Sequence, residues 1–134
     1  QGYTLSDTEA YTMCIPETFT LDSYRKTDLG IIASYKKSST LITLSVYESF
    51  VGGWGPDPCI KQEQVQFMGK TAEEITIQKN LSNSGPDDPN PQCGDLLEAL
   101  VLNTSEKWAV GLNGSGQVIN IADYNKARDT FQLK

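Results

Sequence analysis

The chain has 134 residues, of which 38% are hydrophobic and 21% charged, a composition typical of one soluble globular domain spanning residues 1–134. Its formal net charge is −6, and an acidic surface repels phosphate backbones, so nucleic acid is not expected as a partner. No apolar run approaches the roughly 18 residues that a membrane-spanning helix needs, so membrane insertion is not expected either.

The chain begins at Gln1 and shows no signal-peptide pattern, which favours a mature or trimmed form of an exported protein. Histidine is absent, and serine, threonine and asparagine are plentiful. We therefore expect an extracellular, cell-surface or periplasmic location, with a bacterium as the source.

The first elements expected along the chain are strands. Apolar residues alternate from Tyr11 to Ile15, which predicts a strand that Pro16 ends. A short strand is predicted over residues 18–21, and the polar stretch 24–28 predicts a loop.

A hairpin is predicted next, with strands over residues 31–36 and 41–48 joined by a turn at 37–39. Three apolar residues share one face of its second strand: Ile42, Leu44 and Val46. Further strands are predicted around residues 65–67 and over 74–79, 98–102 and 107–112, with a turn at 68–70 and Trp108 in the core or on a sheet face.

The end of the chain has a helical pattern. Asn120 is a good N-cap, and Asp123 falls near the positive end of the helix that would follow. Four residues continue one apolar stripe: Ile121, Tyr124, Ala127 and Phe131. The predicted class is α+β, a mostly antiparallel sheet of about six strands with one or two packed helices, including a C-terminal helix near 120–130.

The three cysteines are Cys14, Cys59 and Cys93, and none forms a CxxC pair, so a zinc cluster is not expected. Cys59 and Cys93 each lie in a loop rich in proline and glycine, which favours a disulfide between them. Cys14 lies in an apolar stretch and is expected to be a buried, inert thiol. The alternative is three free thiols in a cytosolic protein.

The order of elements resembles that of the PsbP/Mog1-like domains of bacterial lipoproteins and secreted proteins. The resemblance is in YTMCIPETFTLDS, in the hairpin GIIASYKKSSTLITLSVYE, in VQFMGKTAEE and in the closing YNKARDTFQLK. Phe19 stands where that family often has a tryptophan. The resemblance implies the fold of that family and an exported location. Members of the family serve mostly as binding or assembly proteins, so the resemblance implies no catalytic residues.

Catalysis has little support in the sequence. Hydrolytic nucleophiles most often need a histidine base, and the chain has none, so we expect no enzymatic activity. A hydrolase with paired carboxylates is the remaining enzymatic alternative, with these candidates: Glu48, Glu63, Glu73, Glu74 and Glu98. Solvated surface carboxylates are the simpler interpretation.

Two unusual loops are the candidate binding sites. Trp54 and Asp57 lie in GGWGPDPC, where the indole has room to contact a sugar or a protein partner. Asp87 and Asp88 lie in a second loop, whose oxygen groups suit calcium although the EF-hand pattern is absent, so no cofactor is expected. A disulfide between Cys59 and Cys93 would join the two loops into one surface, and the alternative is a pinned structural turn.

The sequence thus predicts an exported, non-enzymatic binding or assembly domain with a protein or polysaccharide partner. A second hypothesis is a subunit of a surface filament or coat, whose polar N-terminal segment QGYTLSDTEAYT adds a strand to a neighbouring copy.

Overall fold

The computed structural model describes residues 2–37, 42–48, 58–80, 93–103, 107–114 and 120–134. Within these ranges it contains ten strands and one helix, so the α+β class and the mostly antiparallel sheet are confirmed, whereas the prediction of about six strands is too low. The elements are β1 Tyr3–Asp7, β2 Tyr11–Pro16, β3 Phe19–Thr27, β4 Gly30–Lys37, β5 Ile42–Glu48, β6 Ile60–Phe67, β7 Lys70–Asn80, β8 Cys93–Asn103, β9 Trp108–Gly114, α1 Ile121–Thr130 and β10 Gln132–Leu133.

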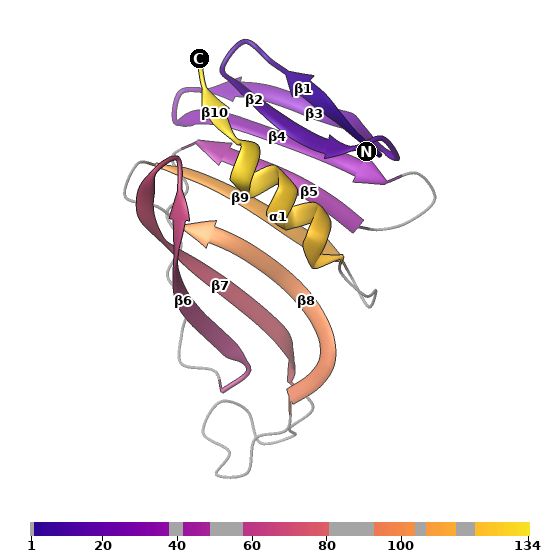
Figure 1. The fold of residues 1–134 in the computed structure, drawn as a ribbon, viewed down its shortest axis with the longest axis vertical. Helices are drawn as coiled ribbons and strands as arrows, with labels where there is room; N and C mark the ends of the chain where they lie inside the picture. The colour runs from indigo at the N-terminus through magenta and orange to yellow at the C-terminus, as the bar shows by residue number, and fades with distance from the viewer. Residues whose placement is uncertain (1, 38–41, 49–57, 81–92, 104–106, 115–119) are drawn as a thin grey trace.

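The strands form two antiparallel sheets. The larger has seven strands in the order β3-β4-β5-β9-β8-β7-β6, and the smaller has three in the order β1-β2-β10. The small sheet and α1 lie against one face of the large sheet, where they cover β3, β4, β5 and β9 (Figure 1). Strands β6, β7 and β8 extend beyond the helix, so this part of the sheet reaches away from the main core (Figure 1).

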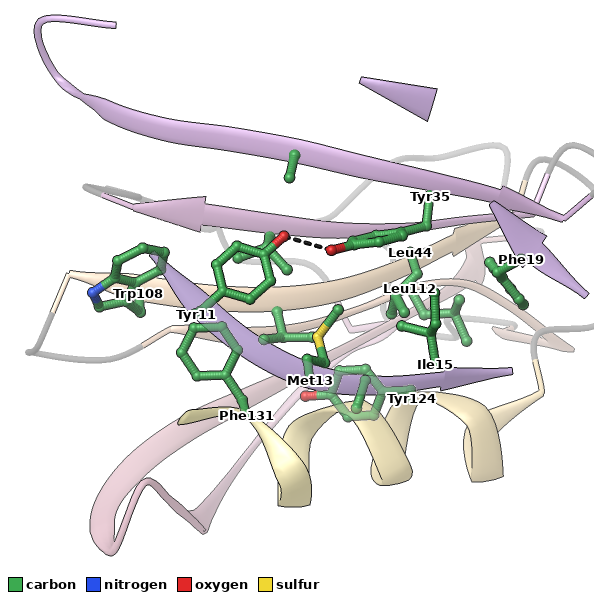
Figure 2. Packing of buried hydrophobic residues seen from close by; sticks show 14 of the residues in the cluster. Tyr11, Met13, Ile15, Phe19, Tyr35, Leu44, Trp108, Leu112, Tyr124 and Phe131 are labelled. Carbon is green, nitrogen blue, oxygen red and sulfur yellow. Dashed lines mark hydrogen bonds between the residues drawn. The ribbon is translucent and has the colours of Figure 1, made fainter. Parts of the chain in front are cut away.

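The core lies between the two sheets and the helix. Its residues alternate along the strands as the period-two pattern requires, and the predicted inward face of β5 is confirmed because Ile42, Leu44 and Val46 are buried. Trp108 is 7% exposed, which confirms its predicted place in the core. Figure 2 shows Tyr11, Met13 and Ile15 of β2 packed between α1 and the large sheet.

Two tyrosine hydroxyls meet inside this core. The Tyr11 and Tyr35 oxygens lie 2.7 Å apart (Figure 2). The Ser6 hydroxyl lies 2.7 Å from that of Tyr35, so these polar groups satisfy one another. Burial raises the pKa values of both tyrosines because it disfavours the phenolate, and the hydrogen bond from Tyr35 raises that of Tyr11 further.

The predicted C-terminal helix is confirmed. The Asn120 side chain accepts a hydrogen bond from the Ala122 backbone N–H at 3.0 Å, which satisfies one of the amides left free at a helix start. Tyr124 and Ala127 are buried, but Ile121 is 44% exposed, so its predicted place on the buried face is wrong. Ile121 is the first residue of the helix and has no preceding turn beside it.

One prediction for a polar stretch is also wrong. Strand β3 contains the short strand predicted over 18–21, but it continues with a bulge between Leu21 and Ser23 as far as Thr27, where a loop was predicted over 24–28. Strand β6 contains the strand predicted around residues 65–67 and begins earlier, at Ile60. Both strands lie at an edge of the large sheet, where solvated polar side chains are tolerated and the apolar alternation is lost.

Cys14 is partly exposed, so its predicted burial is also corrected. It lies opposite Leu5 of β1, and Leu5 is 59% exposed, so the outer face of the small sheet is open at this position. The thiol is free.

Candidate functional site

The described part of the chain has a groove between the β6–β7 turn and the end of α1. Its volume is about 610 Å³, and its lining residues are Gln66, Met68, Gly69, Arg128, Asp129, Phe131, Gln132 and Leu133. It thus joins one edge strand of each sheet to the last turn of the helix.

The wall on the hairpin side is a two-residue turn. Phe67 pairs with Lys70, and Met68 and Gly69 between them have φ values of 52° and 76°, as a type I′ turn requires. The turn predicted at 68–70 is therefore confirmed. Glycine adopts this conformation freely, but a side chain such as that of Met68 does so at a cost of about 1–2 kcal/mol. The strained residue is thus an apolar one that lines the groove.

The floor is set by Phe131, which is 2% exposed. Its ring stacks on those of Phe67 and Tyr11, with centroids 5.2 Å away in each case, and lies 5.5 Å from that of Trp108. These contacts join β6, β2 and β9 at the point where α1 ends, so the groove has a rigid base (Figure 2).

The charged groups of the groove already have partners. Arg128 donates from Nη1 to Glu74 of β7 at 2.6 Å and from Nε to Asp129 at 3.0 Å. Burial alone would lower the pKa of Arg128, but these two carboxylates raise it, so the guanidinium stays charged. The remaining polar side chains of the lining are the amides of Gln66 and Gln132.

Both strands that border the groove have an open edge. The Gln78 N–H donates to the Cys59 carbonyl at 3.0 Å, so odd-numbered residues of β6 face β7 and the backbone groups of Gln66 face away from it. The Lys134 N–H donates to the Ala10 carbonyl at 3.0 Å, so the backbone groups of Leu133 likewise face away from β2. Within the described residues, β6 pairs only with β7 and β10 pairs only with β2.

The predicted binding residues Trp54, Asp57, Asp87 and Asp88 lie outside the described residues. The predicted disulfide between Cys59 and Cys93 is confirmed, with Cα atoms 5.4 Å apart. It connects the starts of β6 and β8, which both flank β7. Cys59 and Cys93 follow segments 49–57 and 81–92 in the chain, so the disulfide joins the points at which the described structure resumes after each segment.

Three of the five candidate carboxylates, those of Glu63, Glu73 and Glu74, belong to the paired strands β6 and β7. Glu63 of β6 lies opposite Glu74 of β7 in the sheet register, and Glu74 is bound by Arg128. No group of three or more histidine, cysteine or acidic residues placed to hold a metal occurs among the described residues.

The sequence did not single out the residues that build the groove. The sequence predicted a turn at Met68 and Gly69, but it did not predict that the turn lines a site. No sequence pattern predicted a site at Arg128, Asp129 and Leu133, because these residues reach the hairpin through the packing of α1 against the sheets.

Comparison with protein-family models and with curated proteins gives no match to the chain. The resemblance to PsbP/Mog1-like domains therefore stays a prediction. In the part of the chain that the structure describes, no helix has the length and hydropathy needed to cross a membrane.

Proposed function

We propose that this chain is an exported, non-enzymatic binding domain that holds an extended segment of a protein partner in the groove between β6 and β10. The observation that supports this most directly is the groove itself, which is bordered by the outward backbone groups of Gln66 and Leu133. An extended peptide satisfies such groups by adding a strand, and its side chains then fill alternate positions along the groove.

The side chains of the groove suit the same kind of ligand. Met68 and Leu133 offer apolar contact, Leu133 being 46% exposed, and Gln66 and Gln132 offer amide donors and acceptors. A strongly charged small ligand fits less well, since Arg128 is already bound by Glu74 and Asp129. Met68 would accept different apolar side chains of the ligand, because a methionine adapts its shape to its contacts.

A non-enzymatic role is supported by the chemistry of the lining. Carboxylate-based hydrolysis needs two carboxyl groups on either side of the scissile bond. The groove is lined by one carboxylate, that of Asp129, which forms an ion pair with Arg128. The export of the protein is supported by the disulfide between Cys59 and Cys93, since such bonds persist mainly in oxidising compartments.

A second binding surface is favoured by that disulfide. Trp54, Asp57, Asp87 and Asp88 precede Cys59 or Cys93 in the chain, and the disulfide joins these two cysteines at the end of β6 that is far from the groove. We propose this end as the contact for a protein or polysaccharide partner.

The filament or coat hypothesis has less support. Its donor strand would be the N-terminal segment, but Tyr3–Asp7 pairs over its whole length with β2 of its own chain. Donation to a neighbour would first require that pairing to break.

The groove proposal is tested with a library of random decapeptides displayed on phage and selected on the immobilised protein. We expect selected peptides to bind with affinity that falls at least about tenfold in Leu133→Lys, because a charge is then placed beside the apolar contact. Leu29→Lys is the matched control, since Leu29 is 81% exposed in the β3–β4 turn and lies outside the groove. Selection of no peptide, or equal loss in both variants, would refute a peptide site in this groove.

A further inference from the structure

We propose that a second copy of this chain pairs with β6 in an antiparallel, two-fold symmetric arrangement centred on Gln62, so that the two large sheets become continuous. The proposal does not depend on the groove, because it uses residues 60–64, and the part of β6 that borders the groove begins at Gln66.

Among the residues that the structure describes, strand β6 forms the regular open edge of the large sheet. It pairs with β7 over eight consecutive positions without a register shift, whereas β3, at the opposite edge, contains a bulge between Leu21 and Ser23. A bulge protects an edge against strand addition, and the bulge of β3 contains Asp22, which forms an ion pair with Lys36. Four consecutive residues of β6, Lys61 to Gln64, are exposed.

Both ends of β6 are held in place. The disulfide from Cys59 fixes the residue before the strand to the start of β8, and the two-residue turn at Met68 and Gly69 fixes its other end to β7. A strand held in this way loses little conformational entropy when a second strand binds.

The backbone decides which registers are allowed. Odd-numbered residues of β6 face β7, so the free N–H and C=O groups belong to Ile60, Gln62 and Gln64. A second β6 must therefore place even residues opposite even residues. Centring the two-fold axis on Gln62 satisfies this condition and forms about six backbone hydrogen bonds, with Ile60 opposite Gln64 of the other copy.

Charge then selects one of the allowed registers. With the axis at Gln62, Lys61 of each copy lies opposite Glu63 of the other. These are non-hydrogen-bonded pairs of the antiparallel ladder, in which opposite side chains are closest. Moving the axis by one residue places Lys61 opposite Lys61 or Glu63 opposite Glu63, and like charges directly opposite one another are destabilising. Moving it to Gln64 places Glu63 opposite Val65.

The two charges are available for this pairing. Lys61 and Glu63 are exposed, and neither has an ion-pair partner among the described residues. They lie on the same face of β6, because side chains two residues apart share a face. The symmetric register therefore forms two ion pairs across the dimer, each between Lys61 of one copy and Glu63 of the other.

The test uses charge reversal and sedimentation velocity at concentrations up to millimolar. We expect the native chain to form a dimer and Lys61→Glu and Glu63→Lys each to weaken association about tenfold or more, because every opposite-charge pair becomes a like-charge pair. An equimolar mixture of the two variants should form a heterodimer, since both positions are acidic in the first variant and basic in the second. A monomer at every concentration, or a dimer that charge reversal leaves unchanged, would overturn the proposal.

Cysteine cross-linking tests the register even if a charge variant folds poorly. In a Cys14→Ser background, Gln62→Cys should form a disulfide between copies, because residues opposite each other in a hydrogen-bonded pair have Cα atoms about 5.5 Å apart. Gln64→Cys is the matched control, since its two copies would be about 13 Å apart along the strands. Equal cross-linking at the two positions would contradict this register.

Discussion

Arg128 of the helix and Glu74 of the sheet form an ion pair at 2.6 Å in which the side chains are only 17% and 14% exposed. The pair fixes the last turn of α1 to β7, and Arg128 also donates to Asp129. The ion pair therefore holds the end of the helix, which lines the groove, against the large sheet.

Removing the charge of Glu74 should destabilise the fold. We expect Glu74→Gln to lower the free energy of unfolding by about 2–3 kcal/mol, because a largely buried guanidinium loses its charged acceptor. Urea denaturation measures the change. The control is Glu9→Gln, which removes the exposed partner of Lys26 and should have a much smaller effect. Equal effects would mean that the Arg128–Glu74 pair contributes no more than a surface contact.

The buried tyrosines predict a loss of stability in alkaline solution. Burial raises the pKa values of Tyr11, Tyr35 and Tyr124 above their ordinary value of 10.0, so the folded state keeps protons that the unfolded state releases. Their contribution is complete below about pH 10 and falls above it, by about 1.4 kcal/mol per pH unit for each tyrosine.

Urea denaturation of protein alkylated at Cys14, between pH 9 and pH 11, measures this slope. Tyr11→Phe should reduce this slope by the share of one retained proton, which is about 1.4 kcal/mol per pH unit well above pH 10. The variant also loses its hydrogen bond to Tyr35 at every pH, which shifts the whole curve without changing its slope. An unchanged slope would show that Tyr11 ionises equally in both states.

The disulfide should stabilise the fold and hold β6 at the sheet edge. Replacing Cys59 and Cys93 by alanine should lower the free energy of unfolding by about 3–4 kcal/mol, given their sequence separation of 34. Hydrogen exchange of the Lys61 and Glu63 amides, which face β7, should accelerate more than that of β4 amides. In the native chain, alkylation should modify Cys14 alone, and three modified cysteines would contradict the bond.

At Met68 we expect opposite effects of one substitution on the stability of the fold and on peptide binding in the groove. We expect Met68→Asn to raise the free energy of unfolding by about 1 kcal/mol, because asparagine tolerates a φ of 52° better than methionine does. The same change should weaken peptides selected on the groove, since it removes an apolar wall. Thermal denaturation and a peptide titration on the same variant test both parts. Stronger peptide binding would show that Met68 is not part of the site.

The sequence predicted the elements whose apolar residues keep a clear period. Residues 42–48 and 120–130 have one buried face each, and the structure places both as expected. Residues 24–28 were predicted as a loop, and most of them belong to β3 instead, because edge strands are solvated and their side chains need no alternation. The contact between the buried Tyr11 and Tyr35 hydroxyls could not be predicted, since it depends on how the small sheet packs against the large one.

For the candidate site too, local features were predicted from the sequence and contacts between distant segments were not. The pairing of Cys59 with Cys93 was predicted from two similar loops, and the turn at residues 68–70 from a local glycine. The groove was not predicted, because Gln66, Arg128 and Leu133 are brought together by contacts between segments about 60 residues apart in the chain.

By itself, the sequence determined the α+β class, the capped C-terminal helix, the inward face of β5 and the disulfide. Each of these follows from a local signal, such as side-chain period, helix capping or the setting of a cysteine. Tertiary structure alone decided the strand order, the open edges of β6 and β10, and the ion pair between Arg128 and Glu74. These depend on which hydrophobic faces bury one another, and burial between distant segments leaves no local pattern in the chain.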